Sequence, residues 1–378
     1  MKIIVDENIE FGIEAFQQFG DVTLSHGRKI TNEILKDVEV LIVRSITNVN
    51  EDLLKNTPVK FVGTTTIGTD HLDIDYLKSQ KIHFASAPGC NSYAVTEYVL
   101  CAVVKIAHEK KINLTNKTLG VVGYGNIGKK ITKFAEAVGL KTYVNDPPLQ
   151  REGYEYNFCS LEEALNCDII TFHVPLNKTG IDKTFHLLDE QRINELKPGT
   201  ILINTSRGGV VDNIALLKRL QNNNDITVVL DVWENEPIIN SELLQKVYFG
   251  TPHIAGYSYE GKVNGTIMIY NSLCKFLNKE KFWKPVLKAV DSNKIDIAHT
   301  QNAKDLLYQI TNKVYDIESD SNSLKSFRDN QEEKIGTHFD QLRKNYKLRR
   351  EFNNYFVTSQ NLTSEQAAIL QSLRFNLF

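Results

Sequence analysis

The chain has 378 residues, of which 42% are hydrophobic and 24% are charged, and its formal net charge is −2. This length exceeds that of a single hydrophobic core and predicts two or three domains with enough apolar residues to fill them. The nearly neutral charge gives no support for a nucleic acid or an anionic membrane as the main partner.

The cysteines and the N-terminus favour a cytoplasmic protein. The five cysteines are widely spaced and form no CxxC pair, a usage typical of reduced thiols rather than of a disulfide framework. The apolar run Ile3 to Val5 stops at Asp6 and is too short for a signal peptide, and no uncharged stretch approaches membrane-spanning length.

The first ninety residues alternate short apolar runs with longer stretches that mix polar and apolar residues. Such a rhythm is typical of a parallel α/β sheet, with the apolar runs as strands and the mixed stretches as helices. The predicted strands are Lys2 to Val5, Val38 to Val43, Lys60 to Gly63 and Ile82 to Ala85.

The same rhythm restarts at Thr118, after a long apolar helix that we predict from Ser92 to His108 as an interdomain connector. A second long helix, Lys262 to Leu277, can carry the chain back onto the first domain. The predicted strands of this second region are Leu119 to Val122, Lys141 to Val144, Ile169 to His173, Thr200 to Asn204, Thr227 to Asp231 and Val247 to Gly250.

The chain changes character after Pro285. We expect an extended segment from Asp291 to Asn302, a helix from Leu306 to Ile317, a polar break from Ser319 to Ser323 and a helical segment from Phe339 to Phe352. No second glycine fingerprint is present, so this tail is predicted to be a separate module.

The stretch Gly123-Tyr124-Gly125-Asn126-Ile127-Gly128 lies between a predicted strand and an amphipathic helix, Lys129 to Val138. In that setting a GxGxxG pattern indicates a dinucleotide loop, in which the glycines permit a tight turn, a close approach to a pyrophosphate and close helix packing. The pyrophosphate would lie at the helix N-terminus.

Asp146 ends the next predicted strand and follows Gly128 at close to the roughly 20-residue spacing expected for the acid that binds an adenosine ribose. A carboxylate there accepts hydrogen bonds from the ribose hydroxyls and repels a 2′-phosphate. NAD is therefore favoured over NADP. The alternative is a glycine-rich turn with Asp146 as a solvated turn residue.

Three further motifs follow predicted strand ends, where open α/β sheets bind their ligands. Arg207, on a glycine-rich loop, can grip a carboxylate through two parallel hydrogen bonds. Glu236 and His253 can form a general acid/base pair, since a carboxylate fixes the tautomer of a histidine. Taken singly, Arg207 could cap its loop, Glu236 could be a surface acid and His253 a core histidine; their order after a dinucleotide loop favours catalysis.

From the N-terminus to about Asn278, the glycine loop and this Arg, Glu, His order resemble the D-isomer-specific 2-hydroxyacid dehydrogenases. The resemblance is closest to a branch of that family with an extra C-terminal dimerisation domain. It rests on the motifs Ile67 to Asp73, Ser86 to Asn91, Glu97 to Val99 and His253 to Lys262, and on the tail residues Phe339, Asp340, Leu342, Arg343, Tyr346 and Arg349 to Phe352.

The resemblance implies an α/β fold of two Rossmann-like or flavodoxin-like parallel-sheet domains with a cleft between them, plus a smaller C-terminal α+β dimerisation domain. The expected boundaries are 1–92 with 258–285 for a discontinuous substrate (lid) domain, 93–257 for the NAD-binding domain and 286–378 for the dimerisation domain.

It also implies site residues. Arg207, Glu236 and His253 would be catalytic. Ser45, Thr66 and Tyr257 would contact the substrate. The residues expected to contact NAD are Gly123, Gly125, Asn126, Ile127, Gly128, Asp146, Thr205, Ser206, Asp231 and Gly256. For Thr66, an ordinary β-branched strand residue is an equal alternative on the residues alone.

The implied activity is NAD-dependent oxidation of 4-phospho-D-erythronate at its C2 hydroxyl, in pyridoxal phosphate biosynthesis. The alternatives are another dehydrogenase of the family, acting on glycerate or phosphoglycerate, and an NAD-sensing corepressor that binds protein partners. An intact catalytic set argues for chemistry. The implied partners are a small phosphorylated hydroxy acid and a second copy of the chain, with no nucleic acid or membrane.

Two other features have competing interpretations. The stretch Asp70 to Asp73 could suggest a metal site, but a polar turn that caps a helix near Ile74 is preferred, and no metal is expected. The basic residues Arg343 to Arg350 could suggest nucleic acid, but charges in the tail nearly balance, so an interfacial helix face is preferred.

The tail is predicted to form the dimer interface through two apolar helix faces, Leu306, Leu307, Ile310 and Val314 on one and Phe352, Tyr355 and Phe356 on the other. It also supplies Arg343, Arg349 and Arg350, one of which could reach a neighbouring active site and bind phosphorylated substrate.

Overall fold

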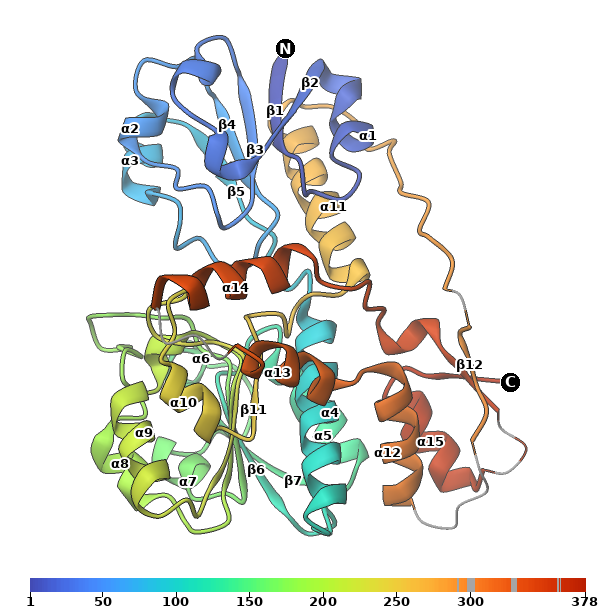
Figure 1. The fold of residues 1–378 in the computed structure, drawn as a ribbon. Coiled ribbons are helices and arrows are strands. Elements are labelled where there is room, and N and C mark those ends of the chain that lie inside the picture. The colour runs from blue at the N-terminus through green and yellow to red at the C-terminus, as the bar shows by residue number, and fades with distance from the viewer. Residues whose placement is uncertain (291, 298–302, 328–331, 359, 361) are drawn as a thin grey trace. The chain divides into compact units, whose positions relative to one another are not determined.

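A computed structural model describes residues 1–290, 292–297, 303–327, 332–358, 360 and 362–378 (Figure 1). The chain divides into two compact units, the first formed by Met1–Asn91 with Ser258–Ala289 and the second by Ser92–Tyr257 with Val290–Phe378. Residues 290–378 thus belong to the same unit as the predicted NAD-binding region. Among the described residues, no helix combines the length and apolar character that a membrane crossing needs.

The first unit is built on a five-stranded parallel sheet in the order β2-β1-β3-β4-β5. Its strands carry the apolar side chains of the core, which α11 (Tyr259–Phe276) covers by packing against β4 and α1. The strands are β1 (Lys2–Asp6), β2 (Asp21–Ser25), β3 (Val40–Val43), β4 (Phe61–Thr64) and β5 (His83–Ala85), and the α-helices before α11 are α1 (Gly12–Phe16), α2 (Glu51–Leu54) and α3 (Ile74–Ser79).

The second unit holds a six-stranded parallel sheet in the order β11-β10-β9-β8-β6-β7. The strand order reverses between β6 and β8, which is where open α/β sheets bind nucleotides. The strands are β6 (Thr118–Val122), β7 (Lys141–Asn145), β8 (Ile169–Phe172), β9 (Ile201–Asn204), β10 (Thr227–Leu230) and β11 (Phe249–Gly250).

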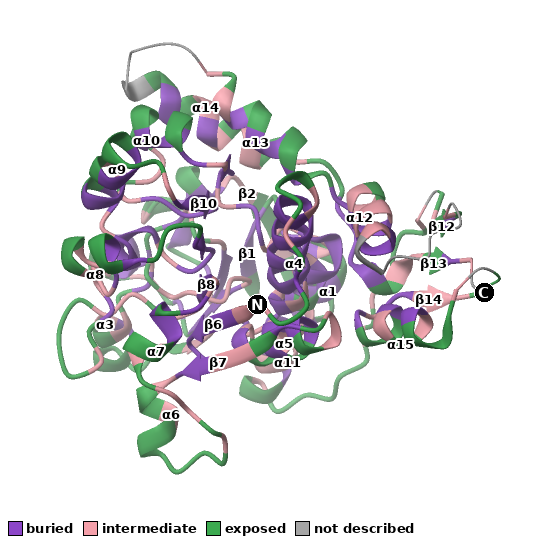
Figure 2. Cartoon of the chain, turned by 90° about the horizontal axis from the view of Figure 1, so that it is seen from below, coloured by how far each residue is buried: buried purple, intermediate pink, exposed green. Residues whose placement is uncertain are grey.

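Helices cover this second sheet. The long helix α4 (Ser92–Glu109) is buried along nearly its whole length, as its colour in Figure 2 shows. It packs against α5 and against α12 (Ala303–Val314) of the tail. The other α-helices before the tail are α5 (Gly128–Ala137), α6 (Pro147–Arg151), α7 (Leu161–Leu165), α8 (Glu190–Glu195), α9 (Asn213–Asn222) and α10 (Ser241–Lys246).

The tail is an α+β module, with a small parallel sheet in the order β12-β13-β14. Its elements are β12 (Lys294–Ile295), α12 (Ala303–Val314), α13 (Ile317–Lys325), α14 (Glu332–Lys344), β13 (Phe356–Val357), α15 (Ser364–Ser372) and β14 (Asn376–Leu377). The predicted fold class, two parallel α/β sheets and a smaller α+β module, is therefore confirmed. The predicted extended segment from Asp291 to Asn302 lies partly outside the described residues.

Three predictions of secondary structure were wrong. The helical segment predicted from Phe339 to Phe352 ends at Lys344, the last residue of α14, and residues 346–351 are not helical. The strand β2 was missed because it is a sheet edge whose side chains are largely exposed, so its residues lack the continuous apolar run of the buried strands. The predicted polar break Ser319 to Ser323 lies inside α13. Its serines are helical because Asp316 caps the helix and Ser321 accepts a hydrogen bond from the Gly250 N–H of the edge strand β11.

The apolar faces expected at a dimer interface are largely covered by the chain itself. Leu306, Leu307 and Ile310 of α12 are buried in the core that α4 shares with the sheet. Phe352 is also buried and stacks on Phe375, with 4.5 Å between the ring centroids. These residues therefore give no argument for an interface between subunits.

Candidate active site

The glycine loop follows β6 at the point where the strand order reverses. Gly123 has a φ of +99°, and a Cβ there would lie 2.7 Å from the His173 carbonyl oxygen. A Cβ on Gly128 would lie 2.0 Å from the Gly123 carbonyl oxygen, so the turn closes only with glycine at both positions. A Cβ on Gly125 would meet nothing within 4 Å, which leaves the backbone open to a ligand at the N-terminus of α5.

Asp146 lies beside this loop, at the end of β7. Its Oδ2 accepts a hydrogen bond of 2.7 Å from the Tyr124 N–H, and its Oδ1 accepts one of 3.0 Å from the Leu149 N–H as the N-cap of α6. The carboxylate is thus held against the glycine loop, and it is not a freely solvated turn residue. Asn126 and Ile127 complete the loop before α5.

Asn204, the last residue of β9, folds the turn that carries Thr205, Ser206 and Arg207. Its Oδ1 accepts from the Ser206 N–H at 3.0 Å and from the Ser206 hydroxyl at 2.8 Å, while its Nδ2 donates to the Arg207 carbonyl at 2.9 Å. A Cβ on the following Gly208 would lie 1.9 Å from the Trp233 backbone. The Arg207 loop therefore lies directly against the loop that carries Glu236.

Glu236 and His253 form a hydrogen-bonded pair, with 2.7 Å between Glu236 Oε2 and His253 Nδ1. The second oxygen of Glu236 accepts a 2.8 Å hydrogen bond from the Trp233 N–H, which fixes the carboxylate. Burial acts to raise the pKa of Glu236, but His253 and these hydrogen bonds outweigh it and hold the pKa below its ordinary value. Because Nδ1 is engaged, Nε2 is the ring nitrogen left to exchange a proton with a substrate.

Asp231 anchors the loop that presents His253. Its Oδ1 accepts from the Thr251 hydroxyl and the Ile254 N–H, both at 2.7 Å, and its Oδ2 accepts from the Ala255 N–H at 2.9 Å. His253 itself has a φ of +55°, a backbone conformation that residues with side chains rarely adopt and that gathers at functional sites. The Asp231 contacts hold that conformation in place, so this residue supports His253 whatever it contributes to NAD.

Gly256 and Tyr257 follow on the same loop, and the tail approaches them. The Tyr257 ring lies edge-on to that of Tyr346, with 5.9 Å between centroids, and the guanidinium carbon of Arg343 lies 5.6 Å from the Tyr257 ring centroid. Arg349 donates hydrogen bonds to the carbonyls of Ala94 and Ala255 at 2.9 and 2.5 Å. The module after residue 290 therefore forms part of the surroundings of the catalytic loop within one chain.

In the first unit, Ser45 and Thr66 follow the adjacent strands β3 and β4 at their carboxyl ends. Ser45 is exposed, whereas the Thr66 hydroxyl donates to the Gly68 carbonyl at 2.9 Å and lies 2.7 Å from the Thr64 hydroxyl. The contact of Thr66 is local, and its role toward substrate stays a prediction. Asp73 caps α3 as predicted, and the side chain of His71 lies 2.9 Å from that of Thr64.

One group of side chains in the described residues has the spacing of metal ligands: His186, Asp212 and Glu234. The atoms that could bind a metal already take part in hydrogen bonds within the protein. Glu234 Oε1 lies 2.7 Å from His186 Nε2, its Oε2 accepts from the Asn213 N–H at 3.0 Å, and Asp212 caps α9. We therefore interpret the group as the support of the turn before the catalytic loop.

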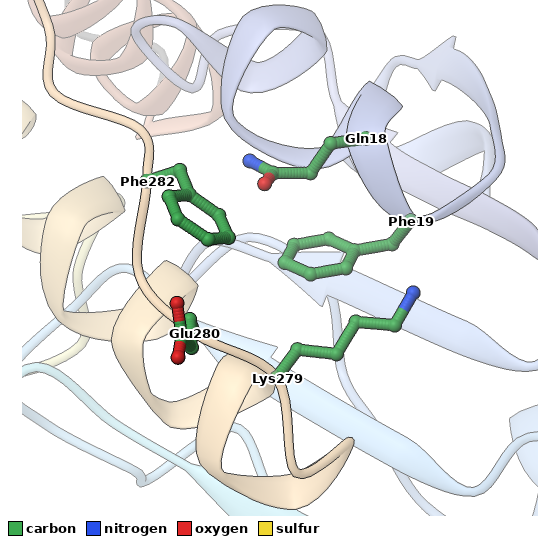
Figure 3. A pocket seen from close by; sticks show the side chains of 5 residues that line it. All are labelled: Gln18, Phe19, Lys279, Glu280 and Phe282. Atoms are coloured by element: carbon green, nitrogen blue, oxygen red, sulfur yellow. The ribbon is translucent and has the colours of Figure 1, made fainter.

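A pocket in the first unit lies away from the predicted substrate contacts. It measures about 360 Å³ and is lined by Gln18, Phe19, Lys279, Glu280 and Phe282, whose side chains face one another in Figure 3. Gln18 and Phe19 come just before β2, at the amino ends of the strands, whereas ligands of α/β sheets bind at the carboxyl ends. We do not assign this pocket a role in catalysis.

One residue near the site, His173, was not predicted from the sequence. His173 follows β8 at the switch point, its Nε2 lies 2.8 Å from the Thr171 hydroxyl, and burial lowers its pKa to about 3, so it is neutral. Its position at a strand end was a signal that could have found it. Arg343 was predicted only as one of three tail arginines that could reach a neighbouring active site, whereas the structure brings it to Tyr257 of its own chain.

Comparisons with known proteins agree with this geometry. Residues 102–255 match the family model described as D-isomer specific 2-hydroxyacid dehydrogenase, NAD binding domain, and residues 286–373 match a domain of unknown function. The chain is 44% identical over 379 residues to the erythronate-4-phosphate dehydrogenase of Escherichia coli O127:H6, covering 100% of this chain and 98% of the relative.

Solved structures are similar to a large part of the chain. An NAD⁺-bound 3-phosphoglycerate dehydrogenase from Entamoeba histolytica is 27% identical, with a TM-score of 0.63 over 74% of this chain and 95% of that one. A D-lactate dehydrogenase from Aquifex aeolicus, complexed with NAD and lactic acid, is 26% identical, with a TM-score of 0.59 over 74% and 96%.

Proposed function

The chain belongs to the erythronate-4-phosphate dehydrogenases, within the D-isomer-specific 2-hydroxyacid dehydrogenase family, and we propose that it oxidises 4-phospho-D-erythronate at its C2 hydroxyl with NAD. The product is 2-oxo-3-hydroxy-4-phosphobutanoate, on the route to pyridoxal 5′-phosphate. The main support for this reaction is the 2.7 Å hydrogen bond between His253 Nδ1 and Glu236 Oε2 in the nucleotide-binding unit.

In this reaction His253 Nε2 takes the proton of the C2 hydroxyl as the hydride leaves C2. Glu236 holds the imidazole ring through Nδ1 and stabilises the imidazolium that forms. Arg207 binds the substrate carboxylate and favours the charge that develops on the carbonyl oxygen. The structure supports these roles through the contact between the Gly208 and Trp233 backbones, which brings the Arg207 and Glu236 loops together.

NAD, when bound, accepts the hydride. The glycine loop fits its pyrophosphate because Gly125 is open and the N-terminus of α5 follows. Asp146 would hold the ribose hydroxyls. The other residues proposed to hold the cofactor are Gly123, Asn126, Ile127, Gly128, Thr205, Ser206, Asp231 and Gly256, while Ser45, Thr66 and Tyr257 are proposed to contact substrate.

A substrate panel tests the assignment. Purified protein with NAD is offered 4-phospho-D-erythronate, 3-phosphoglycerate, glycerate and lactate, and the reduced cofactor is read by its absorbance. The phosphorylated four-carbon acid should give the highest kcat/KM. A preference for glycerate or phosphoglycerate would move the protein to another branch of the family, and NAD binding without turnover of any acid would favour a corepressor-like role.

We further propose that the chain works as a cytoplasmic homodimer with no nucleic acid or membrane partner. Its five cysteines are free thiols, which supports a reducing compartment. The dimer follows from the resemblance of the tail to a dimerisation domain, and closed two-fold dimers are the commonest oligomers. Sedimentation of the full chain measures the oligomeric state directly, and a stable monomer at micromolar concentration would reject the dimer.

A further inference from the structure

The helix α14 of the tail lies directly on the catalytic loop of the same chain. A Cβ built on Gly336 would lie 3.2 Å from Ile238 Cγ1 and 3.5 Å from Pro237 Cγ, next to the catalytic Glu236. Glycine at this position lets the helix approach the loop closely. The tail therefore covers the loop that carries the catalytic acid.

Arg343 lies two turns further along α14, on the face that begins with Gly336 and continues with the buried Phe339. Its guanidinium carbon is 5.6 Å from the Tyr257 ring centroid and 5.9 Å from that of Phe339. This places a permanent cation beside Tyr257 and Glu236, at the edge of the catalytic pair.

The Arg343 guanidinium does not use all of its hydrogen-bond donors within the described residues. Its Nε is buried and has no hydrogen-bond partner within the described part of the chain. Both oxygens of Glu236 are already engaged, one by His253 and the other by the Trp233 N–H. A buried donor without a partner is costly, and a guanidinium offers five donors in a planar fork that matches carboxylate or phosphate oxygens.

The electrostatic surroundings keep Arg343 charged. Burial acts to lower the pKa of Arg343, but Tyr257 and Glu236 outweigh it, and the pKa is raised. In return, Arg343 helps to lower the pKa of Glu236. The guanidinium of Arg343 is therefore already positioned by packing before an anionic ligand binds.

We propose that Arg343 binds the phosphate of the substrate and so determines specificity for a phosphorylated acid, an inference that rests on the proposed function. Arg207 holds the carboxylate at one end of the substrate, the catalytic pair faces C2, and Arg343 receives the phosphate at the other end. The residue acts within its own chain, which differs from the expectation that a tail arginine reaches a neighbouring active site.

The other two tail arginines do not compete for this role. Arg349 donates through Nη2 to the carbonyls of Ala94 and Ala255, and its guanidinium lies over the Tyr315 ring; its Nη1 is also buried without a partner in the described residues, but these contacts hold the side chain in place. Arg350 is buried and donates to Asn354 at 3.0 Å. Both contacts are structural. Lys344, the neighbour of Arg343 on α14, is exposed and serves as a matched control for the loss of one positive charge.

The test compares Arg343→Gln with Lys344→Gln in the full-length protein. Three quantities are measured for each: kcat/KM for 4-phospho-D-erythronate, the inhibition constants of inorganic phosphate and of unphosphorylated D-erythronate, and the dissociation constant of NAD. A charge-assisted hydrogen bond to phosphate predicts that Arg343→Gln lowers kcat/KM about 10- to 100-fold, mainly through KM, and weakens phosphate inhibition similarly.

The same variant should leave D-erythronate inhibition and NAD binding within about twofold, Arg343→Lys should recover part of the loss, and Lys344→Gln should behave as the wild type. An equal loss for phosphorylated and unphosphorylated ligands would show that Arg343 only positions Tyr257 and Glu236, and would overturn the proposal. A wild-type protein that does not oxidise 4-phospho-D-erythronate would instead reject the proposed function, and the two failures are therefore distinguishable.

Discussion

At the scale of single residues, the candidate site depends on one tightly held pair. Glu236 is fixed by the Trp233 N–H on one oxygen and bonds His253 Nδ1 through the other. His253 lies on a loop whose next two backbone N–H groups donate hydrogen bonds to the buried Asp231 carboxylate. The residue proposed to move a proton is thus distinct from the residues that keep it in place.

Replacing His253 by Asn should therefore cut turnover about 100-fold or more, because general acid/base groups typically contribute that much, while NAD binding stays nearly unchanged. Steady-state kinetics and a cofactor titration measure the two effects. Near-normal turnover would remove His253 from the mechanism.

Replacing Glu236 by Gln should cost less activity and should change the pH dependence. The wild-type carboxylate has a lowered pKa and stays ionised at neutral pH, so it can stabilise the imidazolium that the proposed reaction forms. Without that charge the imidazolium is less stable, so the acid limb of the pH–rate profile should move to lower pH. A profile that does not move would argue against electrostatic coupling between the two residues.

Asp146 should set the choice of cofactor. Its carboxylate is proposed to lie where the 2′-phosphate of NADP would bind, so the wild type should prefer NAD over NADP. Asp146→Ala should reduce the ratio of kcat/KM for NAD to that for NADP, mainly because the variant binds NAD more weakly. Asp146 also caps α6, and Asp146→Ser is a matched variant that can keep the cap while removing the charge. Both variants should lose NAD preference, as read from kcat/KM for NAD and NADP. A native preference for NADP would overturn this account.

Sequence reasoning could propose Arg207, Glu236 and His253 because each follows a predicted strand, and the carboxyl ends of parallel strands share one edge of a sheet. It also paired Glu236 with His253, and the structure places Glu236 Oε2 2.7 Å from His253 Nδ1. It could not supply the three contacts of Asp231, since these depend on the path of the loops. Arg343 was named only as one of three candidate tail arginines, because its contact Tyr257 is distant in sequence and no local pattern links the two residues.

At the scale of elements, the structure gives the tail helices a role that periodicity alone could not assign. The serines of α13 were predicted as a break because they are polar, yet Ser321 bonds the edge strand β11, and Lys325 donates to the Tyr248 carbonyl at 3.1 Å. The hydrogen-bonding groups of an edge strand need partners, and here a polar helix supplies them. The buried strands, by contrast, were predicted well because both faces of a parallel sheet are covered and the apolar runs are continuous.

The approach of α14 to the catalytic loop should be sensitive to side-chain size at Gly336. Leucine there would collide with Ile238 and Pro237 and displace the helix or the loop, so Gly336→Leu should lower kcat/KM about tenfold or more, since small displacements of catalytic groups are costly. Gln341→Leu, at an exposed position of the same helix, is the control and should keep full activity. Equal activity of the two variants would mean that α14 does not position the loop.

At the scale of the whole molecule, the tail is joined to the nucleotide-binding unit by buried charges. Arg374 Nη1 lies 3.2 Å from Glu97 Oε1 of α4 and 3.1 Å from Glu351 Oε2, and its guanidinium lies over the Tyr93 ring. Both carboxylates are buried, and burial together with Glu351 raises the pKa of Glu97. Arg374 therefore compensates two buried acids, while Arg349 and the Phe352 N–H also stabilise the charged form of Glu97.

Removing that cation by Arg374→Met should destabilise the protein by about 3–5 kcal/mol, the usual result of leaving a buried charge without its partner. A carboxyl group whose pKa is raised in the folded state binds a proton more tightly there than in the unfolded chain. Stability is therefore lost as pH rises above the unfolded pKa, and the deficit of the variant should be larger at pH 8 than at pH 5.

Urea unfolding at both pH values measures this deficit. Arg151→Met, which breaks the exposed ion pair with Asp182, is the control and should cost less than about 1 kcal/mol at either pH. Adding Glu97→Gln to Arg374→Met should recover part of the stability, because one of the two uncompensated charges is gone. If Arg374→Met lost no more free energy of unfolding than Arg151→Met, the buried acids would be neutral in the folded protein. Apolar packing of α12 and Phe352 alone would then hold the tail to the sheet.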